Sequence, residues 1–205
     1  MGERFSPGFR DLLKTFDLPV IEAHAGTIFG LWRDLRLAYF NPWWLKFAEE
    51  NDGEPSISLD WGLGRSLLDS VPDILRPFYR DLYGNALQQG RLPPLQHEYE
   101  CSSADLFRRF MMTVYPLRQG EGFLVVNSLV VEKAHDPHER KDNEPDPGTY
   151  IGDDGLIRQC SNCRRTKNAK EPNRWDWVSA WVAEPPARTS HTLCAFCLAH
   201  YYPGP

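Results

Sequence analysis

The chain has 205 residues, of which 41% are hydrophobic and 13% aromatic. That is enough for one large domain, or for a domain with a small additional module. The net charge of −5 argues against a general nucleic-acid binder. No apolar run approaches the ~20 residues of a membrane-spanning helix, and the first residues lack the segments of a signal peptide. We therefore expect a soluble, cytoplasmic protein without a membrane partner.

Residues 1–21 are expected to form a short helix ahead of the first domain. Ser6 offers a capping hydroxyl, and Pro7 suits the first position of a helix. The apolar residues that follow recur at helical spacing, at Phe9, Leu12, Leu13 and Phe16. Two interpretations stay open: the helix packs on its own domain, or it contributes to the contact of a homodimer.

Residues 22–133 are expected to form an α+β domain. Two runs rich in aromatic and aliphatic residues predict short strands at 27–32 and 35–40. An apolar spacing of three and four residues then predicts a short helix at 43–50 and a long helix at 73–89. The first half of the domain therefore supplies two strands and the helices that would cover a sheet.

Three longer strands follow, at 96–102, 107–116 and 123–132. The turns between them, at 103–105 and 119–122, are short, so the three strands should form an antiparallel meander. Strands before and after a group of helices predict an antiparallel sheet with its helices collected on one face.

Two C-x-x-C pairs near the C-terminus carry the strongest chemical pattern, formed by Cys160, Cys163, Cys194 and Cys197. A short turn with this spacing can aim two thiolates at one point, and two such turns complete a tetrahedral shell of four sulfurs. This shell suits a zinc ion and leaves no open position, so the predicted site is structural. Two disulfides or a redox dithiol remain as alternatives.

The thirty residues between the two pairs exceed the spacing of about 15–20 in compact ribbons, so a folded segment is expected inside the metal loop. A fifth cysteine, Cys101, is unpaired, and the odd number favours a reducing compartment. We expect Cys101 to be a small core residue. His191 or His200 could each replace one sulfur as a ligand.

Composition separates the cysteine-rich segment from the domain before it. Residues 134–149 are charged and rich in Pro and Asp, which is typical of a linker. Residues 150–205 would form the second unit, with helices at 175–183 and 193–202. A basic patch follows the first cysteine pair, at Arg164, Arg165, Lys167 and Lys170.

Several stretches of the first domain match a known family. They are LRLAYFNPWWLKFAEEN, GLGRSLLDSVP, the FYRDLYGNAL helix and EYECSS…FMMTVYPLRQGEGFLVVNSLVVE. Through them, residues 22–133 resemble a PAS domain, which implies a five-stranded antiparallel sheet with helices on one face. The resemblance also implies a pocket that holds haem, flavin, a small metabolite or nothing. Flavin and haem are disfavoured, because 49–72 has no cysteine and 73–89 no histidine; the ligand stays unknown.

A second pattern runs through the C-terminal segment. Its residues are Cys160, Cys163, Arg164, Arg165, Trp175, Trp177, Ser190, His191, Cys194, Cys197, Tyr202 and Pro203. This order resembles a module of bacterial signalling proteins that follows a PAS or receiver domain. The resemblance supports the order of the two parts and implies no biochemical activity.

Together these features predict a cytoplasmic bacterial signalling or sensory protein rather than an enzyme, since no nucleophile–base pair, paired carboxylates or ATP-binding glycine motif stands out. The PAS-like domain would sense a signal or mediate contacts. The structural zinc module would present Arg164, Arg165 and the face that carries Trp177 and Trp181 to a signalling partner as an interaction surface. The chain would form a homodimer through the PAS-like domain and residues 1–21. The alternative is a thiol redox sensor that uses the C-x-x-C pairs. Nucleic-acid binding is disfavoured by the acidic net charge.

Overall fold

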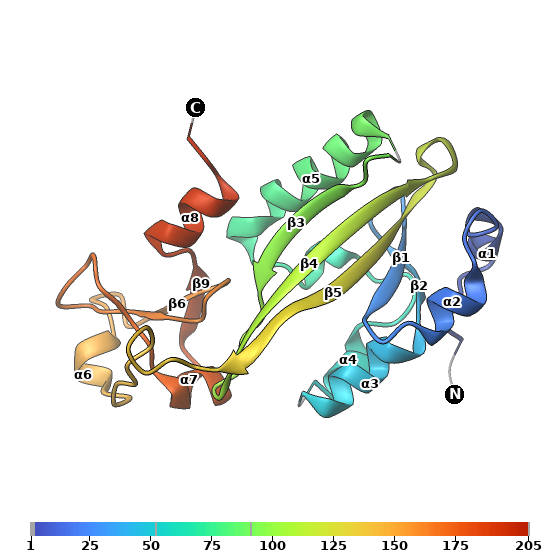
Figure 1. Cartoon of the computed structure of the whole chain (residues 1–205). Helices are drawn as coiled ribbons and strands as arrows, with labels where there is room; N and C mark the ends of the chain where they lie inside the picture. Colours follow the sequence, from blue (N-terminus) through green and yellow to red (C-terminus); the bar gives the residue numbers. More distant parts are fainter. Residues whose placement is uncertain (1–2, 52, 91, 205) are drawn as a thin grey trace. The chain divides into compact units, whose positions relative to one another are not determined.

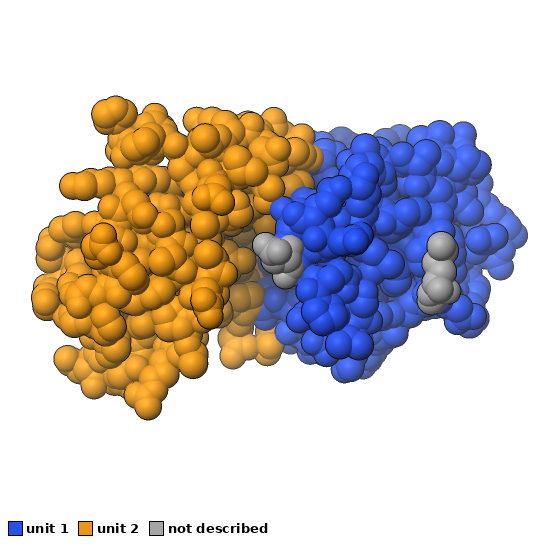
Figure 2. All heavy atoms as spheres, turned by 90° about the horizontal axis from the view of Figure 1, so that it is seen from below, with its two compact units in different colours: residues 1–71, 79–98, 111–128 blue, residues 72–78, 99–110, 129–205 orange. Residues whose placement is uncertain are grey.

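The computed structural model describes residues 3–51, 53–90 and 92–204. The chain divides into two compact units, coloured separately in Figure 2. Unit 1 comprises Met1–Val71, Tyr79–Glu98 and Met111–Ser128, and unit 2 comprises Pro72–Phe78, Tyr99–Phe110 and Leu129–Pro205. The domain boundaries predicted from composition, at 21/22, 133/134 and 149/150, stay a prediction.

An antiparallel five-stranded sheet has the order β2-β1-β5-β4-β3 (Figure 1). Its strands are β1 (Ile28–Trp32), β2 (Leu37–Phe40), β3 (Leu95–Glu100), β4 (Leu106–Leu117) and β5 (Gly122–Ala134). All five lie where periodicity predicted them, within a few residues at each end. The predicted α+β class with a five-stranded antiparallel sheet is therefore confirmed.

The helices before and between the strands are α1 (Phe9–Leu12), α2 (Leu18–Ala23), α3 (Pro42–Glu50), α4 (Ser56–Asp60) and α5 (Arg76–Gln89). Sequence analysis did not predict α4. The long helix expected over 73–89 begins as a 3₁₀ turn at Asp73–Leu75, and its regular part starts at Arg76. Pro77 thus falls in the first turn, where its missing N–H costs no hydrogen bond.

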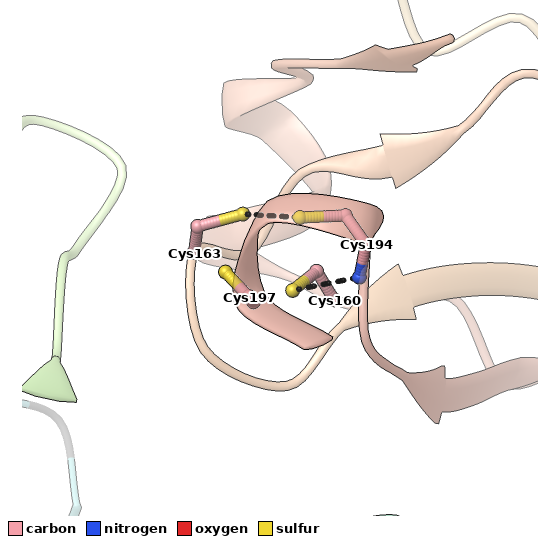
Figure 3. Close-up of side chains that lie close together, drawn as sticks. All are labelled: Cys160, Cys163, Cys194 and Cys197. Atoms are coloured by element: carbon pink, nitrogen blue, oxygen red, sulfur yellow. Dashed lines mark hydrogen bonds between the residues drawn. The ribbon is translucent and has the colours of Figure 1, made fainter. Parts of the chain in front are cut away.

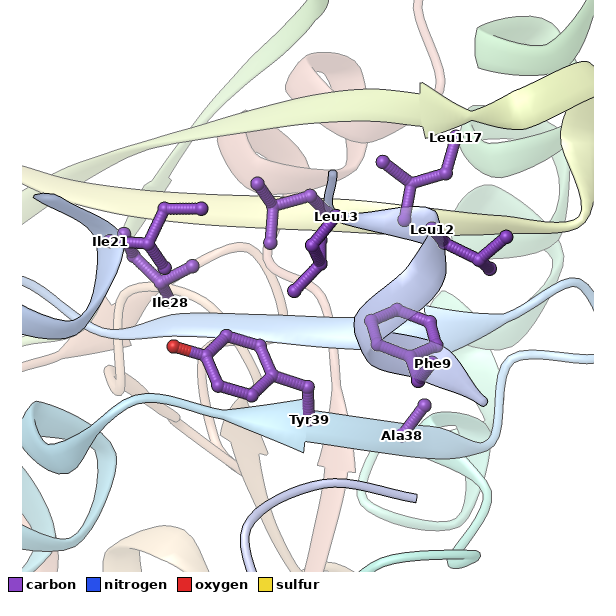
Figure 4. Close-up of a cluster of buried hydrophobic side chains, with 9 residues drawn as sticks. Phe9, Leu12, Leu13, Ile21, Ile28, Ala38, Tyr39 and Leu117 are labelled. Atoms are coloured by element: carbon purple, nitrogen blue, oxygen red, sulfur yellow. The ribbon is translucent and has the colours of Figure 1, made fainter. Parts of the chain in front are cut away.

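One face of the sheet in unit 1 is covered by the N-terminal segment (Figure 4). The buried cluster on this face consists of Phe9, Leu12, Leu13, Ile21, Ile28, Ala38, Tyr39, Leu117 and Leu124. Gly30 of β1 permits the close approach, because a Cβ there would overlap the ring of Phe9. The apolar side chains of α1 therefore pack on the sheet of their own chain, as in the first of the two interpretations above.

The opposite face of the same sheet carries α3 and α5. Successive residues of a strand point to opposite faces, and Phe29 lies next to Ile28 in β1. Phe29 contacts Trp44 of α3, with ring centroids 5.3 Å apart. Phe123, which lies on the Phe29 face through the β1–β5 register, contacts Tyr83 of α5 at 5.0 Å. The two helices predicted at 43–50 and 73–89 thus share one face, as expected.

Unit 2 contains a second sheet of four short strands in the order β8-β7-β6-β9. The strands are β6 (Ile157–Cys160), β7 (Thr166–Lys167), β8 (Trp175–Asp176) and β9 (Thr189–Thr192). The helices of this part are α6 (Pro147–Tyr150), α7 (Ser179–Ala183) and α8 (Ala195–Tyr201). The helix predicted over 175–183 is therefore wrong in its first half, which is strand β8, and β9 was not predicted.

The apolar core around this second sheet is small. Its buried cluster consists of Tyr150, Ile157, Val178 and Trp181. Trp177 is buried as well, so both tryptophans at helical spacing serve packing. A core of this size offers limited hydrophobic stabilisation, and small domains of this kind usually gain further stability from a metal or from disulfides.

The segment 134–149 makes specific contacts inside unit 2. Arg140 Nη2 lies 2.5 Å from Glu100 Oε1, with side chains only 7% and 13% exposed. The Arg140 guanidinium also lies 4.5 Å from the centroid of the Trp177 ring. Asp142 accepts hydrogen bonds from the Ser179 N–H at 2.9 Å and from its hydroxyl at 2.6 Å. Despite its linker-like composition, this segment is thus held by buried charge and hydrogen bonds.

Candidate metal centre

The four cysteines of the two C-x-x-C pairs lie at the ends of two neighbouring strands of unit 2. Cys160 is the last residue of β6, and Cys163 lies in the turn that follows. Cys194 is the N-cap residue of α8, and Cys197 belongs to this helix. Figure 3 shows the four side chains pointing toward one another.

Parallel pairing of β6 with β9 brings the two cysteine pairs together. The register places Cys160 beside Thr192, and the Ser161 N–H donates to the Thr192 carbonyl at 2.7 Å. The residues between the pairs fold into β7, β8, α7 and β9, so a folded segment occupies the loop, as its length predicted. A parallel pair needs such a crossover, because its two strands run in the same direction.

The first cysteine turn is tight and reverses β6 into β7. The Cys160 N–H donates to the Arg165 carbonyl at 2.8 Å, and the Arg164 N–H donates to the Cys160 carbonyl at 3.1 Å. Arg164 has a φ of 63°, in the left-handed region that ends such turns. These backbone bonds fix the direction in which Cys160 and Cys163 present their sulfurs.

The distances between the sulfurs fit a single metal ion. The four Sγ atoms lie within 4.8 Å of one another, and all four residues are buried. Cys163 Sγ and Cys194 Sγ lie 3.8 Å apart. Four bonds of about 2.3 Å to a tetrahedral zinc ion place the sulfurs about 3.8 Å apart. The four cysteines can therefore hold a metal ion, and none of them forms a disulfide.

Two N–H groups from outside the four thiol side chains donate hydrogen bonds to sulfurs of the cluster. The Cys194 N–H donates to Cys160 Sγ at 3.4 Å, and Asn162 Nδ2 donates to Cys197 Sγ at 3.2 Å. The mutual hydrogen bonds of the four thiols lower the pKa of Cys160 but raise those of Cys163 and Cys197. N–H donors compensate the charge of a thiolate and orient it toward a metal.

The histidines considered as replacement ligands do not join this group. His191 and His200 are both exposed. Among the described residues, the group of side chains here that could hold a metal ion consists of the four cysteines and contains neither histidine. Cys101 is partly buried, and desolvation raises the pKa of its thiol. With four sulfurs in the shell, no coordination position remains for water or substrate, which is the arrangement of a structural site.

The surface beside the metal centre differs from the sequence-based expectation. Trp177 and Trp181 are buried, whereas Phe196, between the two cysteines of the second pair, is 85% exposed. Arg165 Nη2 donates to the Glu139 carbonyl at 2.9 Å. Sequence analysis overlooked Phe196, and also Asn162, although both lie inside a C-x-x-C turn, where the intervening side chains flank the metal.

The cavities in the described part of unit 1 do not by themselves identify a ligand. One of about 640 Å³ is lined by Asp11, Arg33, Leu87, Leu117 and Arg118, among others. Leu117 and Arg118 lie at the turn between β4 and β5, Asp11 lies in α1, and Leu87 lies in α5. No cofactor-binding residue is assigned.

In the part of the chain that the structure describes, no helix is long and apolar enough to cross a membrane. No protein-family model matches the chain, and no curated protein matches it at a significant level. The geometry of the four-cysteine centre and of the two sheets is therefore the basis for a function.

Proposed function

We propose that this chain is a cytoplasmic signalling protein of bacterial type, in which a PAS-like domain is combined with a structural zinc module that serves as an interaction surface. The observation that carries the proposal is the buried cluster of four sulfurs, all within 4.8 Å of one another. The five-stranded antiparallel sheet, with α3 and α5 on one face, fits a PAS fold. All five cysteines are free thiols, which suits a reducing compartment.

Zinc is the metal that this donor set favours. Four thiolates in a tetrahedral arrangement select zinc or an iron–sulfur centre, and two C-x-x-C turns are typical of structural zinc sites. The small core of Tyr150, Ile157, Val178 and Trp181 supports a structural role, because metal binding would supply the folding free energy that the core lacks. We propose a binding rather than a catalytic role, since four sulfurs fill the shell.

The charge of the zinc module suggests the chemistry of its partner. The stretches 155–170 and 188–204 contain no Asp or Glu, although the whole chain has a net charge of −5. Their cations are Arg158, Arg164, Arg165, Lys167, Lys170 and Arg188. The exposed ring of Phe196 adds an apolar anchor of the type enriched at binding hot spots. We propose an acidic protein segment with an apolar side chain as the partner.

Self-association through the PAS-like domain and residues 1–21 is a further part of the proposal. Phe9, Leu12 and Leu13 are buried on the sheet of their own chain. A homodimer would therefore use other side chains of this segment, such as Val20, which is 60% exposed. Sedimentation of the purified chain measures its mass in solution, and a monomer at all concentrations would remove the dimer from the proposal.

Charge reversal tests the interaction surface. The zinc-loaded chain, immobilised, captures proteins that are identified by mass spectrometry, purified and measured for direct binding. We expect Arg164→Glu with Arg165→Glu, and separately Phe196→Ala, to weaken this binding at least tenfold. Lys14→Glu is the matched control, because it changes charge at an exposed residue of unit 1. Unchanged affinity in both surface variants, with zinc retained, would remove this surface from the model.

A thiol redox sensor is the second candidate, because Cys163 Sγ and Cys194 Sγ, from different pairs, lie only 3.8 Å apart. Hydrogen peroxide could oxidise these two thiols to a disulfide. The S–S bond forms as the O–O bond of the peroxide breaks, the two electrons from the sulfurs reduce the peroxide to two water molecules, and the metal is released. Zinc release measured with a chromogenic chelator during peroxide titration distinguishes the two candidates. Release within minutes at micromolar peroxide supports the sensor, and retained zinc supports a purely structural centre.

A further inference from the structure

Asn162, inside the first C-x-x-C turn, connects the metal centre with another part of unit 2. Its Nδ2 donates to Cys197 Sγ at 3.2 Å. Its Oδ1 accepts hydrogen bonds from the Glu100 backbone N–H at 3.0 Å and from the Tyr201 hydroxyl at 3.2 Å. One side-chain amide thus binds a candidate metal ligand with one end and the end of β3 with the other.

The orientation of this amide follows from its partners. A backbone N–H can only donate, so the amide oxygen must face Glu100, and the NH₂ group must then face the sulfur of Cys197. The position of Cys197 Sγ therefore fixes the NH₂ end of Asn162 and, through the planar amide, the oxygen that faces the Glu100 N–H.

Glu100 continues the contacts into the buried part of unit 2. Its Oε1 accepts from the Ser102 hydroxyl at 2.6 Å and from Arg140 Nη2 at 2.5 Å. Arg140 in turn lies over the Trp177 ring, and the ring of His135 lies 4.5 Å from that of Trp177. The backbone that Asn162 holds therefore belongs to the residue that anchors segment 134–149.

We propose that Asn162 is a positioning residue that couples the metal centre to the end of the β3–β4 hairpin, residues 99–110. The proposal rests on the metal site proposed above. A bound metal would fix the position of Cys197 Sγ and with it the Asn162 amide, so that the Glu100 N–H stays paired. Loss of the metal would let Cys197 Sγ move, weaken the hold on the Asn162 amide and on its hydrogen bond with the Glu100 N–H, and so loosen the hairpin end. The mobility of the hairpin end would thus depend on whether the metal site is occupied.

Three variants of the zinc-loaded full chain separate the two ends of the amide. Asn162→Ala removes all three side-chain hydrogen bonds, to Cys197, Glu100 and Tyr201. Asn162→Asp keeps an oxygen for Glu100, but places an anionic oxygen against Cys197 in place of the donor. Ser161→Ala is the matched control in the same turn, because the Ser161 hydroxyl is buried without a hydrogen-bond partner.

Two measurements are made on each variant: zinc affinity by competition with a chromogenic chelator, and amide hydrogen exchange with and without zinc. We expect Asn162→Ala and Asn162→Asp to bind zinc about 10- to 100-fold more weakly. With saturating zinc, Asn162→Ala should exchange faster at residues 99–110 while the amides around Val178 stay protected. Asn162→Asp should keep the hairpin protected, and Ser161→Ala should match the wild type.

The outcomes distinguish this inference from the proposed function. If the wild type binds no zinc in a native mass spectrum, both the metal site and the coupling are overturned. If zinc binds but Asn162→Ala has wild-type affinity and unchanged exchange at 99–110, only the coupling is overturned. The coupling is supported if both Asn162 variants bind zinc more weakly and if, of the three variants, only Asn162→Ala exchanges faster at residues 99–110.

Discussion

Replacing Arg140 by methionine tests whether segment 134–149 is an integral part of unit 2. The Glu100 and Arg140 side chains are 13% and 7% exposed, and Nη2 lies 2.5 Å from Oε1. Arg140→Met keeps much of the apolar stem but leaves the Glu100 carboxylate buried with only the Ser102 hydroxyl as a side-chain partner. Removing one partner of a buried ion pair costs about 3–5 kcal/mol, and we expect a loss of this size in the free energy of unfolding.

Urea unfolding of the zinc-loaded chain, followed by circular dichroism, measures this loss. Lys14→Met is the matched control, because its ion pair with Asp11 is exposed, with side chains 71% and 59% accessible, and such pairs contribute little. Glu100→Gln combined with Arg140→Met should recover part of the loss, since the buried charge is gone, and the double-mutant cycle then gives the coupling of the pair. If Arg140→Met costs no more than Lys14→Met, the segment behaves as a free linker and the reasoning is refuted.

Three further predictions concern the metal, the sheet and one carboxylate. Cys163→Ser should abolish stoichiometric zinc in a native mass spectrum and leave unit 2 without a cooperative unfolding transition; full zinc binding would contradict the four-sulfur site. Gly30→Ala should destabilise the chain by about 1–3 kcal/mol through overpacking, whereas Gly62→Ala, with open space around its Cβ, should change the melting temperature little. Burial raises the pKa of Asp142, but hydrogen bonds from Ser179 outweigh it and hold that pKa below its usual value. The carboxylate therefore stabilises the fold above its unfolded pKa, and this contribution disappears as the pH falls through the lower folded pKa; Asp142→Asn should lose less stability than the wild type below about pH 4, and parallel curves would contradict this.

Local patterns in the sequence predicted the larger sheet well. Alternating or continuous apolar runs predicted β1 to β5 to within a few residues, because the apolar pattern of a strand is a local property of its own sequence. The helical spacing at 175–183 was misleading. Trp177 and Trp181 are buried there, but Trp175 and Asp176 pair with β7. Tertiary pairing overrode the local preference for a helix.

Segment 134–149 shows the limit of composition as a guide. Its many charges and prolines are typical of a linker. Arg140 is nevertheless buried, and it is paired with the carboxylate of Glu100, forty residues earlier in the chain. A charged residue is normally exposed unless it is paired. Local sequence patterns do not identify which distant residue will pair with a given charge. The same holds for Phe196, whose exposure depends on what the fold leaves uncovered.

The sequence by itself identified the four cysteines that can hold a metal ion, because each C-x-x-C turn can aim two sulfurs at one point through local geometry. It also determined the five strands, because their side chains form alternating or continuous apolar runs. Only the tertiary structure decided that β6 and β9 run parallel and bring the two turns together, and that Asn162 lies between Cys197 and Glu100. These features depend on contacts between residues far apart in the chain, and such contacts exist only once the backbone has folded.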